Sequence, residues 1–188
     1  MPILEIIQPD NPILRKKAFR VPDSSFNDAK FQQLVDDMIE TMDSANGVGL
    51  AAPQIAQSLR LIVVRLPDTS EEDREEYGEL AGQLFVVANP KIIKQSREMV
   101  EGVEGCLSMP GLLGEVDRYE MVVVTGQDRH GKDFRIKAKD WLARVFQHEI
   151  DHLDGVLFID LTDKVWQPNL EADEADSEDI AEVTTEDA

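Results

Sequence analysis

The residues with the clearest chemical meaning form one stretch, His148-Glu149-Ile150-Asp151-His152. Residues four apart on a helix lie on one face, about 5–6 Å apart at Cβ, so both imidazoles can bind one divalent ion. Glu149 would lie beside that ion, where a carboxylate can take a proton from a metal-bound water. The stretch indicates a metal-dependent hydrolase, although a His-x-x-x-His pair on a surface helix also occurs without a function.

A catalytic site of this kind needs a third protein ligand and an open position for water. The metzincin pattern would place a third histidine at position 158, where the sequence has Phe158. A thermolysin-like site would use a downstream glutamate, and Glu171 has the right type but follows Pro168 in an acidic segment. The only cysteine, Cys106, is the remaining soft ligand.

Length and composition predict one globular domain followed by an acidic tail. The 188 residues are 42% hydrophobic, which is enough for one sizeable core. Residues 171–188 contain nine Asp and Glu but no Lys or Arg, so we expect a domain over residues 1–165 and a mobile tail over 166–188. The net charge of −19 argues against binding to nucleic acid or to an anionic membrane.

The sequence also predicts a cytoplasmic protein. A single cysteine allows no internal disulfide and gives no sign of an oxidising compartment. The first residues lack the basic start and long apolar run of a signal peptide, and no window is long enough to span a membrane.

The metal-binding stretch requires a helix, and the sequence predicts one over residues 139–153. Apolar residues recur there at helical spacing, and Gly155 would cap the C-terminal end. A second amphipathic helix is predicted over residues 31–45. Strands are predicted at residues 60–65, 84–88, 92–95, 99–103, 121–125, 134–138 and 156–159.

The connecting segments are predicted from proline, glycine and charge. Four prolines in residues 1–25 predict an extended strap with a short helix at 13–18. Asn89-Pro90 predicts a turn, residues 128–132 a hairpin turn, and the acidic residues 68–79 an exposed loop. Strands of mixed order with segregated helices favour the α+β class.

Three separated motifs resemble those of the peptide deformylases. The resemblance extends to Pro12–Arg15 and Gly155–Phe158, so it covers nearly everything before the tail, and it is greatest to the bacterial and organellar type 1 group. It implies an α+β fold in which mixed, mostly antiparallel β-sheets pack around a central metal-binding helix. The motifs are Gly47–Gln54 (GVGLAAPQ), Glu104–Ser108 (EGCLS) and Gln147–His152 (QHEIDH).

The resemblance implies removal of the N-formyl group from the N-terminal formylmethionine of new polypeptides, with release of formate. Cys106, His148 and His152 would bind one Fe²⁺ per chain, although Ni²⁺, Co²⁺ or Zn²⁺ could occupy such ligands. Glu149 would carry the proton from water to the departing amine. The Gln54 side-chain amide and the Leu107 backbone N–H would stabilise the developing oxyanion.

Further residues are expected around these groups. Gly49 and Gly105 would pair with the substrate peptide as an added strand. An apolar slot for methionine would come from Val48, Trp141, Val145 and the aliphatic stem of Arg144, although these residues could equally be ordinary core. Support for the ligands is expected from Asp151, or from Arg118 paired with Glu104.

The chain departs from the family pattern at two places. Many bacterial members carry an arginine after the cysteine motif that can touch the substrate backbone, whereas Pro110–Gly114 has none. Some members end in a basic helix that docks on the ribosome, whereas this C-terminus is acidic. We therefore expect formyl-Met nascent peptides as partners, at most transient ribosome proximity, no direct nucleic-acid or membrane binding, and a monomer or weak dimer.

Two rival functions make different predictions. An HExxH endopeptidase would cleave internal peptide bonds and would be indifferent to Cys106→Ala. A non-catalytic metal-binding or redox-sensing protein would bind metal without releasing formate, and it would leave Gln54 and Glu149 unexplained.

Overall fold

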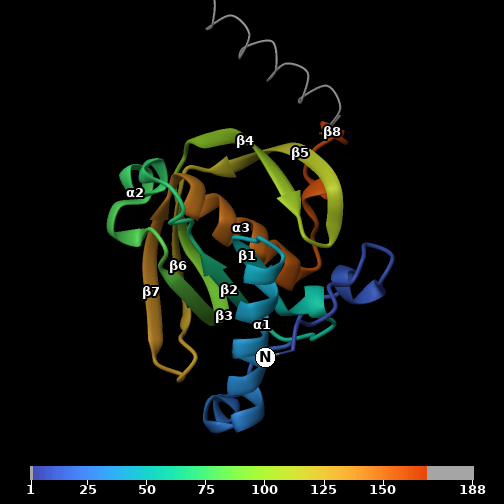
Figure 1. The fold of residues 1–188 in the computed structure, drawn as a ribbon, viewed down its shortest axis with the longest axis vertical. Coiled ribbons are helices and arrows are strands. Elements are labelled where there is room, and N and C mark those ends of the chain that lie inside the picture. The colour runs from blue at the N-terminus through green and yellow to red at the C-terminus, as the bar shows by residue number, and fades with distance from the viewer. Residues whose placement is uncertain (1, 169–188) are drawn as a thin grey trace, which may run out of the picture.

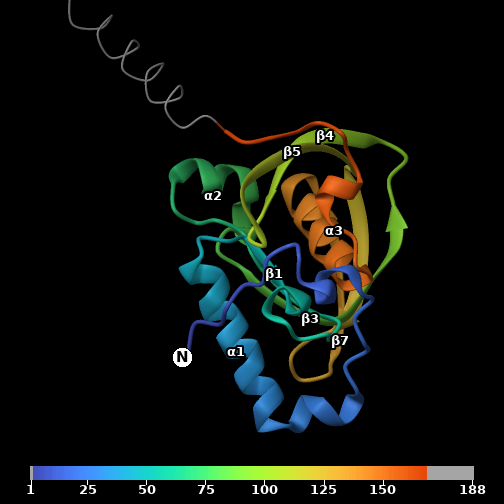
Figure 2. The same cartoon turned by 90° about the vertical axis from the view of Figure 1, so that its right-hand side faces the viewer.

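A computed structural model describes residues 2–168, which form two antiparallel sheets around one central helix (Figures 1 and 2). The larger sheet has the strand order β1-β2-β3-β6-β7 and the smaller one β4-β5-β8. Helix α3 (Asp140–Asp154) lies between them, so the predicted α+β class and central helix are confirmed. The strands are β1 Gly49–Ala51, β2 Leu61–Arg65, β3 Leu84–Gln95, β4 Met99–Cys106, β5 Met109–Tyr119, β6 Met121–Gln127, β7 Asp133–Lys139 and β8 Val165–Trp166.

Helix α3 forms because its apolar residues recur on one face and its ends are well defined. Phe146 and Leu153 are fully buried, and Phe146 packs edge-on against Phe85 of β3. Gly155 ends the helix in the left-handed conformation, at φ 79°, and its N–H donates to the last turn. An added Cβ at Gly155 would lie 2.8 Å from the Arg15 carbonyl group, so glycine is required there. The predicted helix and its cap are confirmed.

Helix α1 (Ala29–Ser44) covers the opposite face of the larger sheet, over β1, β2 and the first half of β3. The Asp28 side chain caps it by accepting a hydrogen bond from the Lys30 N–H. Val35, Met38 and Met42 pack against residues of the sheet. The predicted helix is therefore correct, with its start two residues earlier.

Two predicted connections are wrong. Residues Glu71–Tyr77 form helix α2, not a loop, because Ser70 and Asp73 cap its first turn reciprocally. Asn89-Pro90 does not end a strand: β3 runs through it with a register shift, and Asn89 takes a positive φ of 53°. The buried Asn89 side chain exchanges hydrogen bonds with the backbone of Val21, which stabilises this irregularity.

The smaller sheet differs most from prediction. Strand β5 was not predicted, because Pro110, Gly111 and Gly114 interrupt the strand pattern. The predicted strand over residues 156–159 is wrong: Phe158–Asp160 is a 3-10 turn, and β8 pairs with Leu113 and Gly114 of β5. The predicted short helix near the N-terminus is a 3-10 turn at Pro12–Arg15.

The described residues contain no helix that is long and apolar enough to cross a membrane. Most of the predicted acidic tail, including Glu171, lies outside the described residues, which end at Pro168.

Replacing Phe146 with alanine should lower the free energy of unfolding by about 3–5 kcal/mol, because a buried aromatic side chain is lost and a cavity remains. Urea denaturation monitored by circular dichroism measures this. Phe19→Ala is the matched control, since Phe19 is 73% exposed, and it should change stability by less than about 0.5 kcal/mol. Equal losses in both variants would contradict the assigned packing of α3.

Candidate metal centre

Three predicted ligands from two distant segments meet at one point. Cys106 ends β4, while His148 and His152 lie one turn apart on α3. One ligand atom of each side chain lies within 4.8 Å of the other two, and the Cys106 Sγ is 3.3 Å from the His152 Nε2. Both histidines are buried.

This donor set fits a divalent transition metal. A tetrahedral ion with metal–sulfur and metal–nitrogen bonds of about 2.3 and 2.0 Å separates sulfur from nitrogen by roughly 3.5 Å, close to the distance observed. The His148 Nδ1 lies 2.9 Å from the Glu104 Oε2, which leaves its Nε2 for a ligand bond. Phe158, at the metzincin position, stacks on the His148 ring and has no ligand atom.

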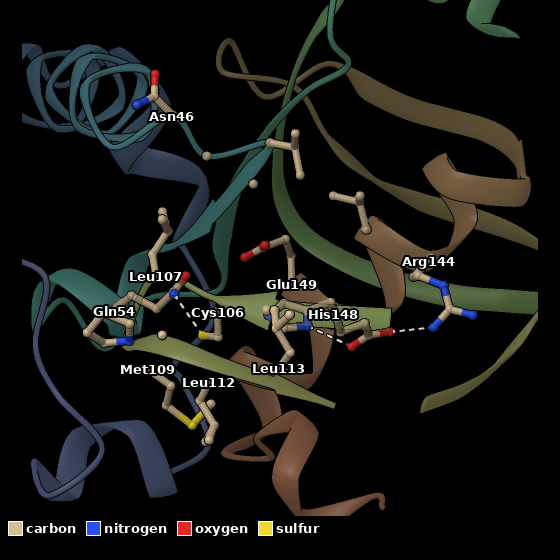
Figure 3. Close-up of a pocket in the computed structure, with 18 of the residues that line it drawn as sticks. Asn46, Gln54, Cys106, Leu107, Met109, Leu112, Leu113, Arg144, His148 and Glu149 are labelled. Carbon is tan, nitrogen blue, oxygen red and sulfur yellow. Dashed lines mark hydrogen bonds and ion pairs between the residues drawn. The ribbon is translucent and has the colours of Figure 1, made fainter. Parts of the chain in front are cut away.

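Glu149 lies beside these ligands and not among them (Figure 3). Its side chain is buried, and its Oε2 has no hydrogen-bond partner among the described residues. Burial raises the pKa of Glu149 to about 7, and the neighbouring His148 only partly opposes this. A carboxylate with such a pKa can both accept and donate a proton near neutral pH.

A hydrogen bond from a nearby backbone N–H holds the Gln54 side chain close to Cys106. Its Oε1 accepts a hydrogen bond of 2.8 Å from the Ala51 N–H, which orients the amide. The Nε2 then points to the Cys106 Sγ at 3.5 Å (Figure 3). It also lies 3.4 Å from the buried Ser108 Oγ. Leu107 follows Cys106 in the two-residue turn between β4 and β5 and lines the same cavity.

A network of charged side chains contacts the candidate ligand His148 through Glu104. Arg118 of β5 donates to both oxygens of Glu104, at 2.8 and 3.0 Å, and also to Asp151 at 2.5 Å. Arg144 of α3 donates to the Glu104 Oε1 at 2.9 Å. Asp151 and the Arg118–Glu104 pair, which the sequence suggested as alternatives, therefore belong to one network. The Arg144 guanidinium belongs to the same network through Glu104.

The network holds Glu104 ionised. Burial raises the pKa of Glu104, but hydrogen bonds from His148 and Arg118 outweigh it and lower the pKa to about 2. Burial lowers the pKa of His148, but hydrogen bonds with Cys106 and Glu104 outweigh it and raise the pKa to about 10. Burial, with the charges of His148 and Arg118, lowers the pKa of His152 well below its ordinary value. The side chains around His148 thus favour a positive charge at its ring. A bound metal ion can supply that charge in place of the ring proton.

The six predicted substrate-binding residues all line one cavity of about 420 Å³ beside the ligands. Arg144 contributes mainly as a structural group, because its guanidinium also donates to the backbone oxygens of Val100, Gly102 and Val116. Gly102 leaves room for it, since an added Cβ would lie 2.7 Å from the Arg144 Nη2. The six residues are Val48, Gly49, Gly105, Trp141, Arg144 and Val145.

Several cavity residues were missed from the sequence. Met109, Leu112 and Leu113 line the cavity from β5, and Asn46 lines it from the turn that follows α1. The signal for the β5 residues was weak, because glycine and proline obscure the strand in which they lie. Ser108 was present in the cysteine motif but was not assigned a contact.

The sequence matches the family described as Polypeptide deformylase over residues 3–167. It is 46% identical over 186 residues to "Peptide deformylase" of Symbiobacterium thermophilum, covering 99% of this chain and 79% of that protein. It is 48% identical over 160 residues to "Peptide deformylase" of Dehalococcoides mccartyi, covering 85% of this chain and 86% of that protein.

Solved structures agree with this assignment. A Met-Ala-Ser-bound class I type b peptide deformylase from Acinetobacter baumannii aligns with a TM-score of 0.77 and 36% identity, covering 86% of this chain and 99% of that one. Peptide deformylase from Thermotoga maritima aligns with a TM-score of 0.75 and 35% identity, covering 86% and 98%. The chain therefore belongs to the polypeptide deformylase family, metal-dependent hydrolases that remove the N-formyl group from new polypeptides.

Proposed function

We propose that this chain is an iron-dependent peptide deformylase of the cytoplasm, acting on the N-terminal formylmethionine of nascent polypeptides. The observation that carries the proposal is the meeting of the Cys106, His148 and His152 ligand atoms beside a buried carboxylate, Glu149. A bound Fe²⁺ would supply Lewis acidity at the formyl group and lower the pKa of a water molecule. Ni²⁺, Co²⁺ and Zn²⁺ suit the same ligands, so iron is a proposal that metal analysis must test.

Glu149 is proposed as the proton carrier. Its free Oε2 would accept a proton from the attacking water as the new C–O bond forms at the formyl carbon. The same oxygen would then deliver that proton to the amine nitrogen as the C–N bond breaks. The products are formate and a peptide with a free amino group.

Gln54 and Leu107 are proposed to stabilise the negative charge that develops on the formyl oxygen. The Gln54 amide is already oriented by Ala51 and points toward the cavity, so little reorganisation is needed. The Leu107 backbone N–H belongs to the turn directly after Cys106. Two donors held by rigid elements suit this role.

The substrate peptide is proposed to bind between two sheet edges. Strands β1 and β4 are both edge strands, and Gly49 of β1 and Gly105 of β4 line the cavity. An extended peptide could add its backbone there, with its methionine side chain directed to Val48, Trp141 and Val145. The Met-Ala-Ser peptide named in the Acinetobacter baumannii structure is of the same kind.

Formate release from formyl-Met-Ala-Ser, with metal content determined on the same anaerobic sample, tests the proposed function. We expect about one iron per chain and turnover that a chelator removes and Fe²⁺ restores. Cys106→Ala should lose both metal and turnover, because one of three ligands is gone. Cleavage of internal peptide bonds that survives Cys106→Ala would instead support an HExxH endopeptidase, and bound metal without formate release a non-catalytic protein.

Glu149→Gln should lower kcat by about 10²–10⁴-fold while metal content is unchanged, because the amide cannot carry the proton. Steady-state kinetics and metal analysis on the same protein measure this. Glu75→Gln, the same change at an exposed position on α2, is the matched control and should leave kcat unchanged. Full activity of Glu149→Gln would show that another group is the base.

Gly49→Ala should lower kcat by about 100-fold, because its Cβ would lie 2.3 Å from the Glu149 Oε1 and displace the carboxylate. Metal content and the urea midpoint should remain close to those of the wild type. A rise in KM with unchanged kcat would contradict this prediction and would limit Gly49 to substrate pairing.

A further inference from the structure

No helix among the described residues covers the outer face of one half of the larger sheet. Helix α1 packs on the outer face of β1, β2 and the first half of β3, and α3 packs on the inner face. The outer face of the second half of β3, with β6 and β7, lies at the left of Figure 1, and the side chains of β3 and β7 on it are exposed, whereas Val123 of β6 is buried.

Five cations lie on this outer face, and we call them the cationic face. In β6, Val122 and Val124 point inward to the core, so Val123 and Thr125 point outward. Paired residues of neighbouring strands share a face. Lys137 and Lys94 flank Val123, and Arg135 and Lys91 flank Thr125, while Lys139 pairs with Met121 one step further along β7.

The five cations are exposed and have no ion pair among the residues described by the structure. Cations two residues apart along β7 are separated by about 6.7 Å, and those across one intervening strand by about 9.6 Å. Asp133 is the acidic residue that shares the face, and it lies at one end, opposite Gln127.

Protection of the sheet edge does not account for this pattern. Exposed edge strands often carry charge to prevent aggregation, and β7 is an edge. That purpose concerns the edge strand alone, whereas Lys91 and Lys94 lie on β3, which is paired on both sides. The charged residues of two adjacent cross-strand rows, Lys94–Val123–Lys137 and Lys91–Thr125–Arg135, are all cations, and this therefore needs a further explanation.

We propose that the cationic face binds the phosphate backbone of double-stranded RNA. Repeated cations on one sheet face, without an ion pair among the described residues, match closely spaced phosphates, and the Thr125 hydroxyl can donate to a phosphate oxygen. Single-stranded RNA would require aromatic side chains for stacking, and the outward residues of β6 are Met121, Val123, Thr125 and Gln127. The binding is therefore independent of base sequence.

The net charge of −19 does not forbid this contact, although it led us to expect no nucleic-acid binding. At physiological ionic strength the Debye length is about 8 Å, so acidic groups further away are largely screened at the point of contact. None of the five cations lines the catalytic cavity, so the face is separate from the proposed active site.

Fluorescence anisotropy of the full-length protein with a labelled 20-base-pair RNA duplex tests the proposal. We expect a Kd of about 10⁻⁵ M near physiological salt, which falls steeply as salt is lowered. The double variant R135E/K137E should weaken binding at least about tenfold and flatten the salt dependence, because two phosphate contacts are lost.

The control is K16E/K17E, which changes the net charge equally on an exposed part of the N-terminal strap. It should alter the Kd less than about twofold. Both variants should release formate at the wild-type rate, so the result is independent of the proposed catalysis. Absence of RNA binding, equal weakening in both variants, or binding only to vesicles that contain phosphatidylserine would overturn the proposal.

Discussion

The structure around the metal centre depends on one buried carboxylate, that of Glu104. Its two oxygens bind His148, Arg118 and Arg144, so one side chain of β4 joins β5 to two positions of α3. Arg118 also binds Asp151, which gives two carboxylates and two guanidinium groups in one network. Because a buried charge without partners costs several kcal/mol, these groups constrain each other's positions. The orientation of the His148 ring follows from that constraint.

Apolar packing places the helix, and polar contacts then orient its side chains. Phe146, Leu153 and their neighbours hold α3 against the larger sheet, while Arg144, His148 and Asp151 turn toward the smaller one. Glu149 lies between the sheets, where one of its oxygens has no hydrogen-bond partner within residues 2–168 and burial raises its pKa. Both sheets contribute to the cavity beside Glu149, through Gly49 of β1 and Gly105 of β4.

Local patterns were sufficient for much of the fold. Helices α1 and α3 were predicted because their apolar residues repeat at helical spacing, and Gly155 was predicted as a cap because helices often end in a left-handed glycine. Strand β5 and the course of β3 through Asn89 could not be predicted in this way. In β5 the hydrogen bonds to the preceding strand β4 override the local signals of proline and glycine, and in β3 the hydrogen bonds between Asn89 and the distant Val21 override the turn signal.

The sequence by itself determined which groups are candidates for the centre, because His148, Glu149 and His152 on one helical turn offer two possible ligands and a neighbouring carboxylate. It also identified Cys106 as the third candidate ligand. Only the tertiary structure decided that the Arg144 guanidinium belongs to the network around Glu104, and that five cations lie together on one sheet face with no ion pair in the part of the chain that the structure describes. Both depend on strand register and on which face a neighbouring helix leaves open, and these are set by contacts between residues far apart in the chain.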